Sequence, residues 1–145
     1  MDDILAVLMS WAVTLSGYPT PAAMPHVEAV AHEYFVEHAC GGRECKVLGW
    51  YARGHTLYVD RRLDYRDSLY ASSIVVHEMV HYLQQLDVER RAAQSPGTAT
   101  ICPSAIAMER EAYGVQREYL LRSGEYRPVG ISMHSVGCEE GVAAH

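Results

Sequence analysis

The sequence predicts a small α+β domain that is mostly helical and carries one β-hairpin or small sheet. Three observations support this class. Apolar side chains recur at helical spacing in several stretches, a run of strand-forming residues is broken by a turn glycine, and no repeat, low-complexity run or linker divides the chain. A length of 145 residues suits one compact core, so residues 1–145 are expected to form a single domain.

Composition and charge narrow the classes of function. Hydrophobic residues make up 49% of the chain and charged residues 21%, which is ordinary for a soluble globular protein. The net charge is −6, Lys46 is the only lysine, and Lys and Arg form no cluster. Because binding to phosphates needs a basic surface, we expect no nucleic-acid partner.

The first predicted helix covers the apolar stretch ILAVLMSWAVTL, from Ile4 to Leu15. This stretch is too short for a stable membrane span, which takes about 20 residues. It also lacks the positive leader of a signal peptide, since Asp2 and Asp3 precede it. We therefore expect an amphipathic or buried helix that starts at these acids and ends at Gly17 and Pro19.

A second helix is expected from Pro25 to Ala39. Proline fits the first position of a helix, and apolar residues follow at helical spacing. These apolar residues are Val27, Val30, Ala31, Tyr34 and Phe35.

A β-hairpin is expected in residues 46–60, KVLGWYARGHTLYVD. Two runs of strand formers, Val47–Tyr51 and Thr56–Val59, flank the turn Arg53-Gly54-His55. A glycine between two such runs is typical of a hairpin.

A third helix is expected to start near Ser68 and to continue past Gln85. Seven of its residues share one broad face: Leu69, Ser73, Val76, His77, Val80, His81 and Gln84. A loop with two prolines and a glycine follows. Ser104 can then cap a fourth helix that runs to about Ser123 and stops at Gly124, whereas the tail from Tyr126 to His145 shows no clear pattern.

The third helix contains the motif His77-Glu78-Met79-Val80-His81, of the form H-E-x-x-H. Histidines four residues apart on a helix point the same way, so both imidazoles can bind one Zn²⁺ ion. Glu78 lies about 100° round the helix from His77, where a carboxylate can accept a proton from a water molecule. The motif therefore predicts a zinc site with Glu78 as its general base.

The alternative is an ordinary exposed turn of helix. Its neighbours argue against exposure, because apolar side chains surround the motif: Val75, Val76, Met79, Val80 and Leu83. Burying two histidines and a glutamate without partners would cost several kcal/mol. A bound metal ion removes this cost.

A third ligand is expected on the fourth helix. Glu109 lies on the mostly apolar face with Ala105, Ala112, Tyr113, Gln116 and Leu120. Glu111 lies on the mostly charged face, so we expect it to meet water or to support a ligand from behind. Glu109 is the preferred ligand and Glu111 the alternative.

These motifs resemble a known family. HEMVH followed by a helix with EREAY resembles the glutamate-ligand zincin metallopeptidases (gluzincins), and HExxHxxQ with ExEAY is similar to small uncharacterised bacterial zincin-like proteins. The resemblance covers residues 74–120, about a third of the chain. It implies a zincin-like domain with the H-E-x-x-H motif on a central helix. It also implies His77, His81 and Glu109 as zinc ligands and Glu78 as general base.

The resemblance further implies how a substrate would bind. Zincins pair the substrate peptide with an edge strand, for which Thr56–Val59 is the candidate, with simple covering of the core as the alternative. Tyr113 stands where the gluzincin motif has Asp. Tyr113, Glu111 and His134 are candidates to support a ligand or to donate to an oxyanion, as are Tyr82 and Tyr126.

The four cysteines indicate in which cellular compartment the protein works, because disulfides persist mainly in oxidising compartments. Cys40 and Cys45 bracket a short loop, CGGREC, that a disulfide can close easily, which leaves Cys102 to pair with Cys138. A zinc site of cysteines is less favoured because no C-x-x-C occurs, and four free thiols in a cytosolic protein are the other alternative. Two disulfides would place the protein in the periplasm or outside the cell.

The sequence thus predicts a zinc-dependent peptidase that acts on a peptide or protein substrate. The alternative is a zinc-binding interaction module that has a zincin scaffold but no catalytic activity. A third reading is a deformylase-like hydrolase with Cys102 as a ligand.

Overall fold

A computed structural model describes residues 3–52, 54–94 and 105–130. Its elements show an α+β fold that is mostly helical, as the sequence predicts. In chain order they are α1 (Asp3–Ser16), β1 (His26–Val30), α2 (His32–His38), β2 (Gly49–Ala52), β3 (Thr56–Asp60), α3 (Leu69–Gln94) and α4 (Ala105–Arg122).

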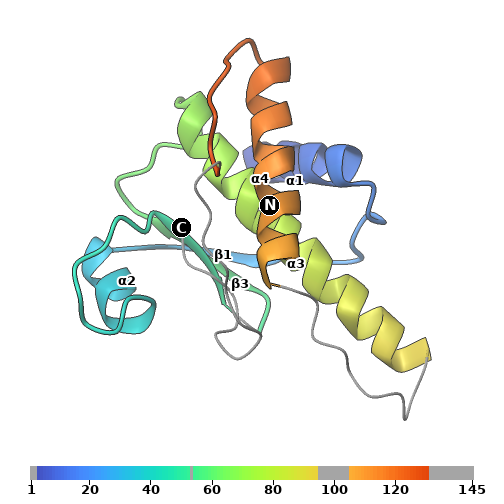
Figure 1. Cartoon of the computed structure of the whole chain (residues 1–145), viewed down its shortest axis with the longest axis horizontal. Helices are drawn as coiled ribbons and strands as arrows, with labels where there is room; N and C mark the ends of the chain where they lie inside the picture. Colours follow the sequence, from blue (N-terminus) through green and yellow to red (C-terminus); the bar gives the residue numbers. More distant parts are fainter. Residues whose placement is uncertain (1–2, 53, 95–104, 131–145) are drawn as a thin grey trace.

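Helix α3 is the element around which the others pack (Figure 1). The Ser68 hydroxyl accepts a hydrogen bond from the Ala71 N–H at 3.2 Å and so caps the first turn. Every residue from Ala71 to Gln84 is buried, because the helix contacts α1, α4, β2 and β3. The prediction that the H-E-x-x-H motif lies on a central, buried helix is confirmed.

Helix α1 packs against both α3 and α4. It buries Leu8, Met9 and Ala12 and keeps Val7 half exposed, which is the one-sided burial expected of an amphipathic helix. It ends where the Gly17 N–H donates to the Val13 carbonyl at 2.9 Å. Among the described residues, no helix is both long and apolar enough to cross a membrane.

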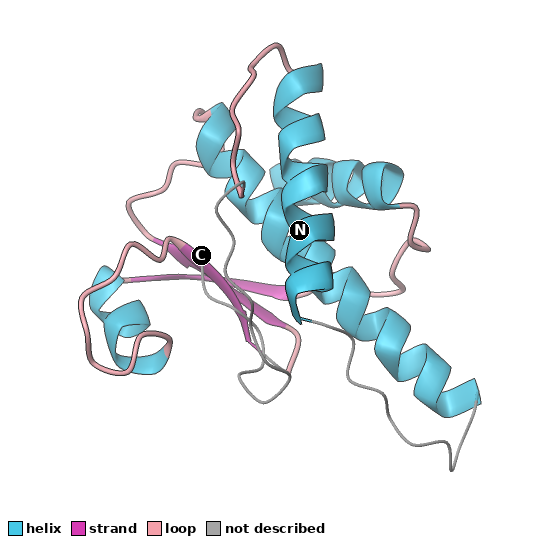
Figure 2. Ribbon diagram, viewed as in Figure 1, coloured by secondary structure: helices cyan, strands magenta, loops and turns pink. Residues whose placement is uncertain are grey.

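The sheet has three strands in the order β1-β3-β2 (Figure 2). Strands β2 and β3 form the predicted antiparallel hairpin, and β1 pairs parallel with β3. The central strand is therefore β3. The expectation that Thr56–Val59 forms the edge strand is wrong, because both of its edges are already paired; the edge strand beside α3 is β2.

The helix predicted from Pro25 to Ala39 is also wrong in its first half. Residues His26–Val30 form strand β1, and only His32–His38 form a helix. The β1 strand gains a ladder of backbone hydrogen bonds with β3, flanked by the His26 N–H donating to the His55 carbonyl at 3.0 Å. This long-range pairing outweighs a local helical pattern that contains two β-branched valines.

Helix α4 crosses α3 and supplies the other wall of the core. It ends at Arg122, as predicted, where the Gly124 N–H donates to the Leu121 carbonyl at 3.0 Å. The chain then turns back along the start of α3, and Arg117 holds it by donating to the Val129 carbonyl at 2.7 Å. The predicted cap, Ser104, lies outside the described residues.

A second, smaller core lies on the side of the sheet where α2 packs. It is formed by Val30, Phe35 and Val47. The predicted disulfide between Cys40 and Cys45 borders it, with their Cα atoms 6.4 Å apart. Cys102 and Cys138 lie outside the described residues, so their pairing stays a prediction.

Candidate metal centre

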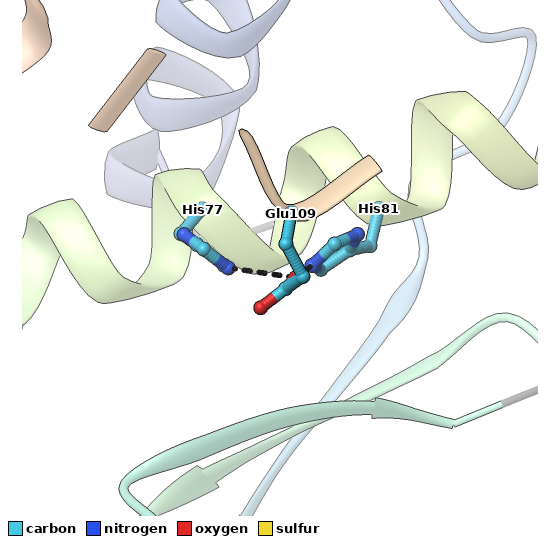
Figure 3. Close-up of side chains that lie close together, drawn as sticks. All are labelled: His77, His81 and Glu109. Carbon is cyan, nitrogen blue, oxygen red and sulfur yellow. Dashed lines mark ion pairs between the residues drawn. The ribbon is translucent and has the colours of Figure 1, made fainter. Parts of the chain in front are cut away.

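Three side chains from two helices converge at one point (Figure 3). His77 and His81 lie one turn apart on α3, and Glu109 reaches them from α4. Its Oε1 atom lies 3.5 Å from Nε2 of His77 and 2.5 Å from Nε2 of His81. One ligand atom from each residue lies within 4.8 Å of the other two, and all three residues are buried. This group could hold a metal ion.

The structure separates the two glutamates of α4. Glu109 faces α3, whereas the Oε1 atom of Glu111 accepts from the Gln84 amide at 2.9 Å and from the Tyr18 hydroxyl at 2.7 Å. Of the two outcomes that the sequence predicts for Glu111, contact with water or support of a ligand from behind, the structure shows the second. The choice follows from helix geometry, because residues two apart on a helix point to different sides.

The hydrogen bonds of Gln84 fix the protonation of the His81 ring. The Gln84 amide nitrogen donates to the Met108 carbonyl at 3.0 Å and to Glu111, two groups that can only accept. Its Oε1 atom therefore faces the Nδ1 atom of His81, 2.7 Å away. An amide oxygen only accepts, so Nδ1 carries the hydrogen. In a neutral ring, Nε2 then carries no hydrogen, and its lone pair points toward Glu109.

The same logic applies to His77. The Ser73 hydroxyl donates to the Tyr70 carbonyl at 2.6 Å and accepts from the Gln116 amide at 3.1 Å. The Oε1 atom of Gln116 then accepts from Nδ1 of His77 at 2.9 Å. Both histidines thus turn their Nε2 atoms toward one carboxylate, which is how imidazoles bind zinc when a second group holds the other nitrogen.

The charges of the cluster favour a cation among these atoms. Burial lowers the pKa of His81, but the hydrogen bond to Glu109 and the charges of Glu78 and Glu109 raise it, and the net shift is upward. The same negative field attracts a metal ion. Ligand atoms of tetrahedral zinc lie about 3.3 Å apart. The contact between His77 and Glu109 already matches this spacing, while that between His81 and Glu109 must open by about 0.8 Å.

Glu78 sits beside the cluster and faces the sheet. Its side chain is fully buried, and its Oε1 atom accepts from the Tyr51 N–H of edge strand β2 at 3.0 Å. Gly49 permits this approach, because a Cβ atom there would lie 2.9 Å from Ile74 Cγ2 and 3.3 Å from Glu78 Cγ. The edge strand and the H-E-x-x-H helix are thus in direct contact at the candidate base.

Tyr113 is the supporting candidate that lies at the centre. Its ring packs edge-on against that of His77, with centroids 4.4 Å apart. Gly130 lies against the other side, where a Cβ atom would collide with the Tyr113 side chain. Burial, followed by the charges of Glu109 and Glu78, raises the Tyr113 pKa to about 12, so its hydroxyl keeps its proton at neutral pH.

The other candidates are not brought to the centre. The Tyr82 hydroxyl donates to the Ala23 carbonyl at 2.7 Å, and Tyr126 is 80% exposed. His134 lies outside the described residues. Gln84 and Gln116 lie on the helix faces that the sequence predicts, but helical spacing alone predicts no role for them. Two amides that share helix faces with the predicted ligands are the signal that could have found them.

A cavity of about 320 Å³ adjoins the centre. It begins at His77, Tyr113 and Gln116 and extends along the first turns of α3 past Ile74 and Tyr70. The segment before β2 forms its opposite wall. Space beside a candidate ligand is what a substrate group would need.

Comparisons of the chain with protein-family models, with curated proteins and with solved structures find no match. The assignment of this centre therefore depends on its own geometry.

Proposed function

We propose that the protein is a zinc-dependent peptidase whose metal is held by His77, His81 and Glu109. The observation that carries the proposal is the fixed direction of the two imidazoles. Gln84 and Gln116 hold both Nδ1 hydrogens, so both Nε2 atoms face Glu109 within a buried site. Two imidazole nitrogens and one carboxylate are the ligand set of many catalytic zinc sites, which keep a fourth position for water.

The chain's own residues suit peptide hydrolysis. A bound zinc ion would act as a Lewis acid toward a carbonyl group and make a water molecule more acidic. Glu78 is the proposed general base, because its carboxylate is close enough to the centre to shift the pKa of both His81 and Tyr113. Tyr113 is the proposed donor to the oxyanion, since it remains protonated and packs against His77.

The gluzincin resemblance of HEMVH and EREAY supports the same roles. Tyr113 stands where the family motif has Asp, so an Asp that would orient a histidine is missing there. We propose that Gln84 and Gln116 supply this support. These amides orient the histidines from behind, a task that carboxylates or carbonyl groups commonly perform in zinc sites.

One observation favours the second reading, a non-catalytic zinc-binding module. Glu78 is 0% exposed, and one of its oxygens already holds the Tyr51 N–H. A carboxylate engaged in this way can serve to fasten β2 to α3. The third interpretation is a deformylase-like hydrolase, in which Cys102 would be a metal ligand and would form no disulfide. Titration of thiols in unfolded, unreduced protein tests it, because the absence of free thiols would contradict it.

The experiment that tests the proposal compares three proteins: the wild type, Glu78→Gln and His77→Ala. Zinc content is measured first, and cleavage of a peptide library is measured next. We expect about one zinc per chain in the wild type and in Glu78→Gln, and much less in His77→Ala. Cleavage should fall at least about a hundredfold in Glu78→Gln. The binding module would be favoured if the wild type binds zinc but shows no peptide cleavage beyond that of the Glu78→Gln protein.

We also propose a periplasmic or secreted location. The disulfide between Cys40 and Cys45 supports it, because disulfides persist mainly in oxidising compartments. Fractionation of expressing cells tests this location.

A further inference from the structure

We infer that the cavity beside His77 binds a carboxylate group of the substrate and that Lys46 recognises it. This inference rests on the proposed function and names its substrate class: peptides with an acidic side chain or a free C-terminal carboxylate next to the bond that is cut.

The walls of the cavity are uncharged except at one place. Leu48, Ile74 and Val129 supply aliphatic surface, and Tyr70 and Tyr113 supply aromatic surface. Among the described residues that line it, Lys46 is the one side chain with a permanent positive charge. An uncharged cavity with a single cation at its wall favours a ligand with one negative charge, because complementary charges select the partner of opposite sign.

The backbone holds Lys46 toward the cavity. Cys45, directly before it, is fixed by the disulfide to Cys40. Val47, directly after it, is buried in the small core on the other side. The Leu48 carbonyl accepts from the Asp60 N–H at 2.9 Å and so starts the pairing with β3. Lys46 and Leu48 therefore both line the cavity, opposite Tyr70, Ile74 and His77 of α3.

Lys46 is available to a ligand. The ion pairs of the described residues leave it out, although several glutamates lie nearby in the sequence, and its side chain is exposed. Arg127 offers a contrast. It lies over the ring of Tyr70 at 4.3 Å and pairs with Glu125 at 2.9 Å. It is thus a neighbouring cation that already has a partner, and it makes a matched control.

Peptide hydroxamates provide a test that does not need catalysis, because a hydroxamate binds zinc directly. Three probes share one backbone: one ends in alanine amide, one in glutamate amide and one in alanine with a free carboxylate. Their affinities for the zinc-loaded protein are measured by calorimetry in the wild type, Lys46→Met, Lys46→Glu and Arg127→Met.

We expect at least one acidic probe to bind the wild type about threefold to fivefold more tightly than the neutral probe, the usual range for a partly solvated ion pair. This gain should vanish in Lys46→Met, reverse in Lys46→Glu, persist in Arg127→Met and shrink as salt is added. The acidic probe that gains identifies the source of the carboxylate.

Two results would overturn the inference. In the first, all three probes bind the wild type equally. In the second, the gain survives in Lys46→Met. Either result leaves the zinc centre intact, because the neutral probe still binds. If no hydroxamate binds zinc-loaded protein, the proposed function itself fails and the inference falls with it.

Discussion

The Nδ1 atom of His81 lies 2.7 Å from the Oε1 atom of Gln84, and this contact decides which side of the imidazole can bind a metal ion. Without it the ring could rotate or carry its hydrogen on Nε2, where the hydrogen would exclude a cation. Gln84→Ala should therefore weaken zinc binding by about tenfold to a hundredfold.

The neighbouring residue offers a matched control for this prediction. Gln85 is also a glutamine on α3, but it reaches toward Glu89, away from the centre. Gln85→Ala should leave zinc affinity unchanged in a competition assay with a chelator. Equal losses from both variants would contradict the role assigned to Gln84.

Glu109 and Glu111 should differ when each is replaced. Glu109→Ala removes a proposed ligand, so zinc should be lost and the melting temperature of zinc-loaded protein should fall. Binding at a thousand times Kd contributes about 4 kcal/mol to folding. Glu111→Gln removes only the charge behind Gln84, so stoichiometric zinc should remain. Zinc retained in Glu109→Ala but lost in Glu111→Gln would show that the two helix faces have been misassigned.

Substitutions of Gly49 and Gly114 by alanine should have opposite effects on stability. A methyl group at position 49 would collide with Ile74 and press on Glu78, so Gly49→Ala should destabilise the protein by about 1–3 kcal/mol. Gly114 lies within α4, where the nearest atom to an added Cβ is 3.9 Å away. Gly114→Ala should stabilise by about 0.5–1 kcal/mol, because alanine favours helix. Urea unfolding measures both, and no loss in Gly49→Ala would argue against the tight contact of β2 with α3.

Asp60, which lies outside the metal centre, should make the free energy of unfolding depend on pH. Its buried carboxylate accepts from the Arg62 Nε at 2.9 Å and from the Arg62 guanidinium at 2.7 Å. The Arg62 hydrogen bond lowers the pKa of Asp60 below the usual value of an aspartate. A lowered folded-state pKa stabilises the protein above the unfolded pKa, and this contribution disappears as pH falls through the folded pKa.

The measurement for Asp60 is the free energy of unfolding of wild type and Asp60→Asn from pH 7 to pH 2. The variant should be less stable by on the order of 1 kcal/mol near pH 7. The difference should begin to narrow only below about pH 4. A difference that stays constant down to pH 2 would mean that the charge of Asp60 contributes nothing.

The cysteines predict a specific peptide map. A non-reducing digest should yield Cys40 joined to Cys45, and it should also join Cys102 to Cys138. Closing the short loop at Cys40 contributes about 2 kcal/mol by the chain-entropy estimate. Alkylated, unpaired Cys40 in native protein would contradict both the bridge and the proposed location.

The sequence alone determined α1, α3 and α4 and which side chains of α3 and α4 form the cluster of the centre. Spacing of four residues on a buried helix places His77 and His81 together, and the apolar face of α4 selects Glu109 over Glu111. Both inferences hold because an α-helix fixes side-chain directions locally, whatever the helix packs against. The ends of α1 and α4 were equally predictable, since glycines follow both helices.

Tertiary structure decided what depends on contacts between distant segments. Residues His26–Val30 carry a helical pattern, yet they form a strand because β3, thirty residues later, offers them a parallel partner. That pairing makes β3 central and leaves β2 at the edge beside Glu78. Gln116 likewise gains its role only when α4 packs on α3, because its hydrogen bond to His77 joins two helices. Gln84 contacts His81 within α3, but the α4 groups that accept from its amide nitrogen decide which end of the amide faces the ring.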